Sequence, residues 1–191
     1  MFTSILLSLV ASAWAAPAIQ QRALLAPSAS IKNGTVVGSS NGIIDTFNGI
    51  PFAEPPTGTL RLKPPHSITS TYGTITATGT PTACPQFSST DNLQDLPDGV
   101  LGQILDLPIV QTASMAGEDC LTLNIQRPAG TTSSSKLPVL FWIYGGGFEF
   151  GSTQTYDGTE LIAKSVALGQ PVLFVAVNYR LGQHHHTACN K

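Results

Sequence analysis

Residues 137–152 read LPVLFWIYGGGFEFGS, and this stretch decides the fold. Leu137 to Tyr144 is a nearly continuous apolar run, as is the later segment from Pro171 to Val177, and such runs predict strands buried on both faces of a sheet. Between the two runs, Asp157-Gly158-Thr159-Glu160 has the pattern of a capping box and predicts a helix that continues through Leu168. Strand, glycine loop, helix and strand form a βαβ unit with a parallel crossover, so the fold class is α/β.

The sequence before this unit predicts shorter elements. Apolar pieces separated by glycines from Thr35 to Phe52 predict short antiparallel strands joined by tight turns. Leu121 to Gln126 alternates with a period of two, which is typical of a half-buried strand. Thr69 to Thr82 is rich in Thr and Ser and is expected to be a loop. The leucine-rich segment from Leu93 to Leu107 fits a short amphipathic helix in a loop and an ordinary core helix equally well.

The composition excludes one large class of function. The chain has 191 residues, a formal net charge of -2 and 10% charged residues. It therefore lacks the basic surface that binding to nucleic acid or to an anionic membrane would require. Its length allows a single domain with a sizeable core.

The first residues have the pattern of a secretory signal peptide, which we place at residues 1–15. Ile5 to Val10 is a short apolar run, too short to span a bilayer, and Ala13-Trp14-Ala15 fits the cleavage pattern of small residues. The protein is therefore expected to be secreted and extracellular, without a transmembrane segment.

Secretion places the cysteines in an oxidising compartment. A disulfide between Cys84 and Cys120 is then expected, and Cys189 is left over. Asn33 begins the only N-x-[ST] sequence, Asn33-Gly34-Thr35, which predicts a glycosylation site on a surface loop.

The three glycines after the first apolar run are the best candidate for chemistry. Without Cβ atoms, Gly145, Gly146 and Gly147 allow backbone N–H groups to converge on one point and a ligand oxygen to approach closely. Two such donors can stabilise the negative charge that develops on a carbonyl oxygen during acyl transfer. Three glycines alone are equally compatible with a plain flexible turn. Their place between a strand and a βα crossover favours an oxyanion-hole segment.

At this point the chain resembles the N-terminal part of the type-B carboxylesterases. These are α/β-hydrolases and include the cholinesterases and the fungal extracellular lipases. The resemblance is carried by five blocks in the family's order, at residues 49–56, 60–65, 118–124, 141–152 and 175–180. It implies small antiparallel N-terminal strands that lead into a mixed, mostly parallel sheet. Residues 16–182 would then be a partial domain, followed by an unrelated polar tail at residues 183–191.

The resemblance also implies roles for individual residues. Gly146 and Gly147 would donate the two N–H groups of the oxyanion hole. Cys84 would pair with Cys120, and Arg61 would form a buried ion pair with Glu118 beside that disulfide. The loop between the cysteines would be a lid over the substrate groove that contacts a lipid interface. The substrate would be a small-molecule or lipid ester, and no cofactor would be needed.

The catalytic triad of such an enzyme is missing from the sequence. The one G-x-S-x-G match, Gly38 to Gly42 around Ser40, lies ahead of any βα unit and is better interpreted as a hairpin turn. His66 is expected at the surface, and His184 to His186 lie in the polar tail, where adjacent side chains do not converge on a metal. We therefore expect no catalytic Ser, Asp/Glu or His and no metal site.

Two functions follow from these observations. The first is a carboxylic ester hydrolase whose chain is truncated before the nucleophile and is inactive alone. The alternative is a non-catalytic secreted binding protein of the same fold. In either case, a sheet that ends here is expected to leave its last apolar strand as an unpaired edge.

Overall fold

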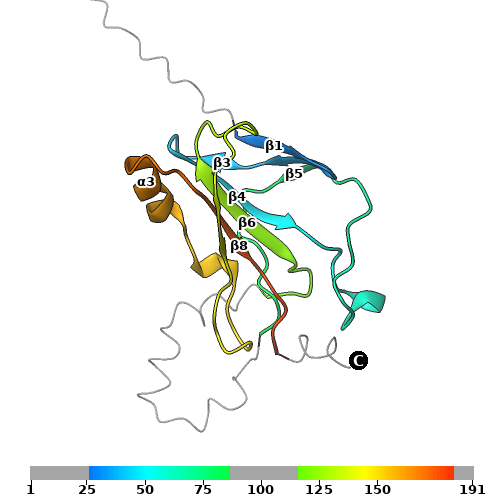
Figure 1. Ribbon diagram of the computed structural model, residues 1–191. Helices are drawn as coiled ribbons and strands as arrows, with labels where there is room; N and C mark the ends of the chain where they lie inside the picture. Colours follow the sequence, from blue (N-terminus) through cyan, green and yellow to red (C-terminus); the bar gives the residue numbers. More distant parts are fainter. Residues whose placement is uncertain (1–25, 87–115, 183–191) are drawn as a thin grey trace, which may run out of the picture.

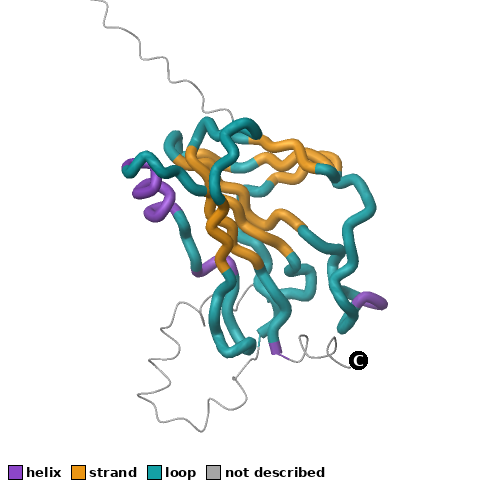
Figure 2. Tube along the Cα trace, in the orientation of Figure 1, coloured by secondary structure: helices purple, strands orange, loops and turns teal. Residues whose placement is uncertain are grey.

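The computed structural model describes residues 26–86 and 116–182. The predicted signal peptide, the segment from Leu93 to Leu107 and the tail at 183–191 lie outside the described residues. The described strands form a three-stranded sheet in the order β1-β2-β5 and a five-stranded sheet in the order β3-β4-β6-β8-β7 (Figures 1 and 2). Their bounds are β1 Ser28–Ile31, β2 Gly34–Val37, β3 Ser39–Ser40, β4 Ile44–Pro51, β5 Gly73–Thr76, β6 Thr122–Pro128, β7 Val139–Trp142 and β8 Leu173–Val177.

The short antiparallel strands predicted near the N-terminus are confirmed. β1 pairs with β2, and β3 pairs with β4, in both cases antiparallel. Between β3 and β4, the Asn41 side chain accepts hydrogen bonds from the N–H groups of Ile43 at 2.9 Å and Ile44 at 2.7 Å. An Asn side chain that bonds to the backbone in this way closes a tight turn.

The predicted loop from Thr69 to Thr82 is wrong in its centre. Residues Gly73–Thr76 form β5, which pairs in parallel with β2. Thr is β-branched and suits an extended backbone, so a Thr-rich segment becomes a strand where a partner edge is available. Strand β2 supplies that edge, and this pairing cannot be predicted from the local sequence.

The predicted βαβ unit is present, and it confirms the α/β class. After β7 come a short 3-10 helix, Thr153–Thr155, the helix α3, Thr159–Ala167, and β8, which pairs with β7 in parallel. The helix begins one residue later than a capping box at Asp157 requires, because its N-cap is Gly158. The Asp157 carboxylate still accepts hydrogen bonds from the N–H of Thr159 at 2.9 Å and from its hydroxyl at 2.6 Å. These bonds lower the pKa of Asp157, the Thr159 hydroxyl contributing most.

The five-stranded sheet is mixed, and α3 and the small sheet lie on opposite sides of it (Figure 1). In the described part of the sheet, β7–β8 is the parallel pairing and the others are antiparallel. One core cluster lies towards the small sheet and another lies beneath α3. The first contains Val36, Phe47, Ile50 and Ala77, and the second contains Ile44, Ile162, Phe174 and Ala176. Among the described residues, no helix has the length and apolar character needed to cross a bilayer.

Strand β6 alternates as predicted, but its polar face is the more deeply buried one. Thr122, Asn124 and Gln126 are each at most 9% exposed, whereas Leu123 and Ile125 are only partly buried against the first core cluster. The Gln126 side chain accepts a hydrogen bond from Gly158 N at 2.7 Å and donates one to Asp157 Oδ1 at 2.7 Å. The polar face of β6 thus fixes the segment that leads into α3.

Strand β7 does not have the burial that its sequence predicts. Val139 is 58% exposed and Phe141 is 55% exposed, so the strand is not buried on both faces. The reason is position, since β7 lies at the edge of the described sheet and β8 lies between β6 and β7. The expectation that the last apolar strand would be the unpaired edge is therefore wrong: the earlier strand of the pair occupies that edge.

Candidate active site

The glycine loop leaves the end of β7 and turns sharply. Gly146 has a φ of 138° and Gly147 a φ of 64°, and the following Phe148 also has a positive φ of 63°. A Cβ on Gly146 would lie 1.9 Å from the carbonyl oxygen of Phe150, a contact that no side chain can make. Gly145 is different, because nothing lies within 4 Å of a Cβ built there. The second glycine is therefore required by the fold, and the first is not.

Hydrogen bonds to a single carbonyl oxygen, that of Gly146, stabilise the shape of the loop. Gly146 O accepts hydrogen bonds from Glu149 N at 3.1 Å and from Phe150 N at 3.2 Å. Within the described ranges, no group accepts a hydrogen bond from the N–H of Gly146 or Gly147. Backbone donors without a partner can bind an anionic oxygen without first giving up another bond.

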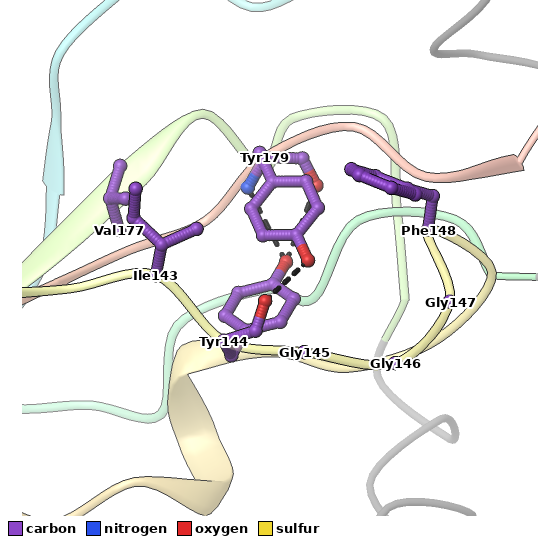
Figure 3. Close-up of a pocket in the computed structure, with 8 residues that line it drawn as sticks. All are labelled: Ile143, Tyr144, Gly145, Gly146, Gly147, Phe148, Val177 and Tyr179. Carbon is purple, nitrogen blue, oxygen red and sulfur yellow. Dashed lines mark hydrogen bonds between the residues drawn. The ribbon is translucent and has the colours of Figure 1, made fainter.

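An open pocket of about 340 Å³ lies at the loop and is mainly apolar. Figure 3 shows the glycines along one side, Phe148 at one end, Ile143 and Val177 at the other, and the rings of Tyr144 and Tyr179 between the two ends. Ile143 and Val177 complete the lining. Its volume is at the lower end of the range for small-molecule sites. The arrangement combines apolar walls with two available backbone donors.

Two tyrosines tie the start of the loop to the end of β8. The rings of Tyr144 and Tyr179 are stacked, with their centroids 4.4 Å apart (Figure 3). The Tyr179 hydroxyl donates to Tyr144 O at 2.5 Å, and the Tyr144 hydroxyl accepts from Tyr179 N at 3.3 Å. Burial raises the pKa of Tyr144 to about 12, so its hydroxyl stays protonated at neutral pH.

The disulfide expected between Cys84 and Cys120 is confirmed. Both cysteines are fully buried, with Cα atoms 5.0 Å apart, and they pack with Ala53 and Leu121. Gln86, two residues beyond Cys84, bonds to Gly151 at the far end of the glycine loop. The disulfide therefore lies near the pocket and not at a remote part of the surface.

The ion pair between Arg61 and Glu118 is present beside the disulfide, but it is not buried. The Arg61 side chain is 55% exposed and that of Glu118 is 26% exposed. A solvated pair of this kind contributes little to stability. The exposure follows from the position of Arg61, which lies just after the short 3-10 helix Gly58–Leu60 in a proline-rich surface passage.

Ser40 lies in the turn expected from its sequence. It forms the end of β3 opposite Asp45, and its hydroxyl accepts a hydrogen bond from Gly42 N at 3.2 Å. His66 is exposed, and its backbone oxygen accepts a hydrogen bond from Glu54 N. The structure brings neither residue to the glycine loop. Cys189 and His184 to His186 lie outside the described residues.

Asn33 is in the turn between β1 and β2 and is half-buried. Its amide nitrogen donates hydrogen bonds to Ile68 O at 3.3 Å and Ser70 O at 2.8 Å. Its backbone oxygen accepts another from Tyr72 N at 2.7 Å. The side chain predicted to carry a glycan thus fastens the loop that precedes β5.

Sequence reasoning missed two residues that support the site. Asn178 is fully buried at the end of β8, accepts a hydrogen bond from Thr153 N at 2.9 Å and donates one to Thr82 O at 3.1 Å. Gln86 holds Gly151. Asn178 lies in the block at residues 175–180 that carries the family resemblance, but no role was predicted for it, and no signal singled out Gln86.

Comparisons with known proteins agree with this architecture. The model of the Carboxylesterase family matches residues 26–185. The chain is 53% identical over 167 residues to Secreted lipase 1 of Botryotinia fuckeliana, covering 86% of this chain and 29% of that protein. It is 43% identical over 170 residues to Lipase 1 of Geotrichum candidum, covering 83% of this chain and 30% of that protein.

Solved structures show the same fold. EstA of Aspergillus niger superimposes with a TM-score of 0.63 at 28% identity, covering 82% of this chain and 26% of that one. A thermophilic pNB esterase gives a TM-score of 0.60 at 32% identity, covering 81% of this chain and 28% of that one. The chain thus spans less than a third of the length of these relatives. On the match over residues 26–185 and the shared fold, the chain belongs to the carboxylesterase family.

Proposed function

We propose that this chain supplies the oxyanion-stabilising part of a secreted carboxylic ester hydrolase. The observation that carries the proposal is the glycine loop, in which the N–H groups of Gly146 and Gly147 have no acceptor among the described residues and border an apolar pocket. Family membership supports the same reaction class.

The chemistry follows from what the loop offers. When a serine attacks an ester, negative charge develops on the carbonyl oxygen, and two positioned N–H donors stabilise that oxygen more strongly than the neutral carbonyl. An acyl-enzyme forms and water then releases the acid, a sequence of steps that needs no cofactor. The apolar walls, among them Ile143, Phe148 and Val177, suit the hydrocarbon part of an ester.

The nucleophile would come from sequence that this chain does not contain. The only G-x-S-x-G match, around Ser40, is a hairpin turn whose serine pairs opposite Asp45. The chain also covers 29% of Secreted lipase 1. Alone, the chain is therefore expected to be inactive.

The remaining assignments are proposals of the same kind. We place a signal peptide at residues 1–15 and the partial domain at 16–182, and we propose secretion because two relatives are named secreted lipases. A lipid ester as substrate, with lipid contact through the segment between Cys84 and Cys120, rests on those same names. Asn33 as a glycosylation site rests on its sequence.

A chimera tests the proposal directly. The segment of Secreted lipase 1 that matches this chain would be replaced by residues 26–182, and hydrolysis of p-nitrophenyl butyrate would be measured. We expect an active chimera, and we expect Gly146→Ala to lower kcat by about 10²–10³ because one donor is misplaced. A chimera that is secreted and melts cooperatively but hydrolyses nothing would disprove the proposal.

Gly145→Ala is the matched control. It adds the same methyl group one residue earlier, where nothing lies within 4 Å. Its kcat should stay within about threefold of the parent chimera, since the donors of Gly146 and Gly147 are untouched. Equal losses in the two variants would mean that the loop tolerates no change at all and would remove the argument for a specific donor.

A further inference from the structure

The short segment from Pro81 to Gln86 is held to the rest of the fold at almost every residue, by hydrogen bonds or by the disulfide. Pro81 O accepts a hydrogen bond from the Gln154 side chain, and Thr82 O accepts one from Asn178 Nδ2 at 3.1 Å. Ala83 O accepts one from Gly117 N at 2.9 Å, and Cys84 is held by its disulfide. The segment is therefore a fixed support, and Gln86 is its last described residue.

Gln86 uses both ends of its amide on a single residue of the glycine loop. Its Nε2 donates to Gly151 O at 3.2 Å, and its Oε1 accepts from Gly151 N at 3.1 Å. Two bonds to one residue fix orientation as well as distance. Gly151 also packs closely against Tyr144, because a Cβ built on Gly151 would lie 2.6 Å from that ring.

Hydrogen bonds inside the loop connect Gly151 to Gly146. Phe150, the residue before Gly151, donates its N–H to Gly146 O at 3.2 Å, and Glu149 donates to the same oxygen at 3.1 Å. Gly146 also lies against Phe150, since a Cβ built on Gly146 would be 1.9 Å from Phe150 O. A displacement of Gly151 therefore displaces Gly146.

We propose that Gln86 is a positioning residue for the glycine loop. By bonding Gly151 to the disulfide-bonded segment, Gln86 holds the N–H donors of Gly146 and Gly147 in place. A role of Gln86 in catalysis rests on the proposed function. The positioning of the loop by Gln86 does not, because the placement of the loop can be measured without any hydrolysis.

Amide hydrogen exchange in the 191-residue chain tests this, with the amides of β6 and β8 as internal references. In Gln86→Ala, Gly151 N loses its acceptor and should exchange about tenfold faster. The proposal further requires faster exchange at Glu149 and Phe150, whose acceptor, Gly146 O, has not been altered. Faster exchange at Gly151 alone would overturn it. Gln170→Ala, an exposed glutamine after α3, is the control and should change none of the three.

Gln86→Glu provides a readout that loss of packing would not produce. The carboxylate can accept from Gly151 N but cannot donate to Gly151 O. Below its pKa of about 4.3 the protonated acid can do both, as the amide does. Relative to the parent chain at each pH, exchange at Glu149 and Phe150 should be faster at pH 7 and return towards the parent rate at pH 3.5. A difference that does not depend on pH would refute the proposal. An inactive chimera would instead remove the proposed function and leave this result unaffected.

Discussion

Strands β7 and β8 are neighbours in one sheet and have the same kind of sequence, yet they differ in burial. Both are apolar, and they pair in parallel so that Phe141 lies opposite Val175. Phe141 is 55% exposed, whereas Phe174 in β8 is 6% exposed. β8 has a strand on either side and α3 above it, and β7 lies at the edge of the described sheet.

Strand β6, on the other side of β8, extends the comparison. It buries Thr122, Asn124 and Gln126 while β7 exposes Val139 and Trp142. Burial in this sheet is therefore decided by what covers a strand and not by its composition. These buried polar groups are tolerated because each has a hydrogen-bond partner: Gln126 bonds to the segment before α3, Asn124 accepts from Gly49 N, and Thr122 accepts from Asn178 Nδ2.

The largest effect is expected from Phe174→Ala in β8. The ring packs with Ile44 and Ile162, so its removal should leave a cavity and cost about 4 kcal/mol of unfolding free energy. Urea denaturation of the purified chain measures this. A loss below about 1 kcal/mol would show that the centre of the sheet is not packed as described.

The second largest loss of stability is expected from Gln126→Leu in β6. The substitution keeps the volume but leaves the buried N–H of Gly158 without its acceptor, which should cost about 2–3 kcal/mol. The same urea experiment applies, with Gln170→Leu at an exposed position as the control. If the leucine variant were as stable as the parent, the polar face of β6 would not be what fixes the start of α3.

Tyr144 is a single buried residue between β7 and the exposed glycine loop, since Ile143 is 64% exposed, Tyr144 is 2% exposed and Phe148 is 60% exposed. Burial raises its pKa to about 12, above the value near 10 for a free tyrosine. The folded state thus holds this proton more tightly than the unfolded state. Its contribution to stability is complete below pH 10 and is lost as the pH rises towards 12.

Absorbance at 295 nm follows this titration, and urea midpoints between pH 9 and 11.5 follow its effect on stability. Tyr144→Phe should flatten the decline of the midpoint above pH 10. A parent chain in which every tyrosine titrates near pH 10 while the fold persists would contradict the burial of Tyr144.

Phe141→Ala in β7 should have the smallest effect on folding, about 1 kcal/mol or less, because half of the side chain is already in water. Self-association should decrease, since an exposed apolar edge strand is a template for pairing with another chain. Sedimentation velocity measures the second quantity. A loss as large as that of Phe174→Ala would mean that β7 is covered in solution.

The βαβ unit and the glycine loop could be predicted because their signals are local. An apolar run, three glycines and the residues from Asp157 to Glu160 each act on their own part of the chain. Three other features could not be predicted, because each depends on a partner far away in the sequence. They are the exposure of β7, the strand at Gly73–Thr76 and the hydrogen bonds between Gln86 and Gly151. Likewise, the glycine pattern does not tell which glycine is required. That distinction comes from the carbonyl of Phe150, which leaves no room at Gly146.

The turn at Asn33 has a consequence for biosynthesis. Its amide nitrogen donates to two acceptors, Ile68 O and Ser70 O. An oligosaccharide attached to that nitrogen would replace one of its two hydrogens, so a single hydrogen would remain for the two loop contacts. If Asn33 is the glycosylation site that we propose, glycan transfer to the unfolded chain would compete with closure of this turn.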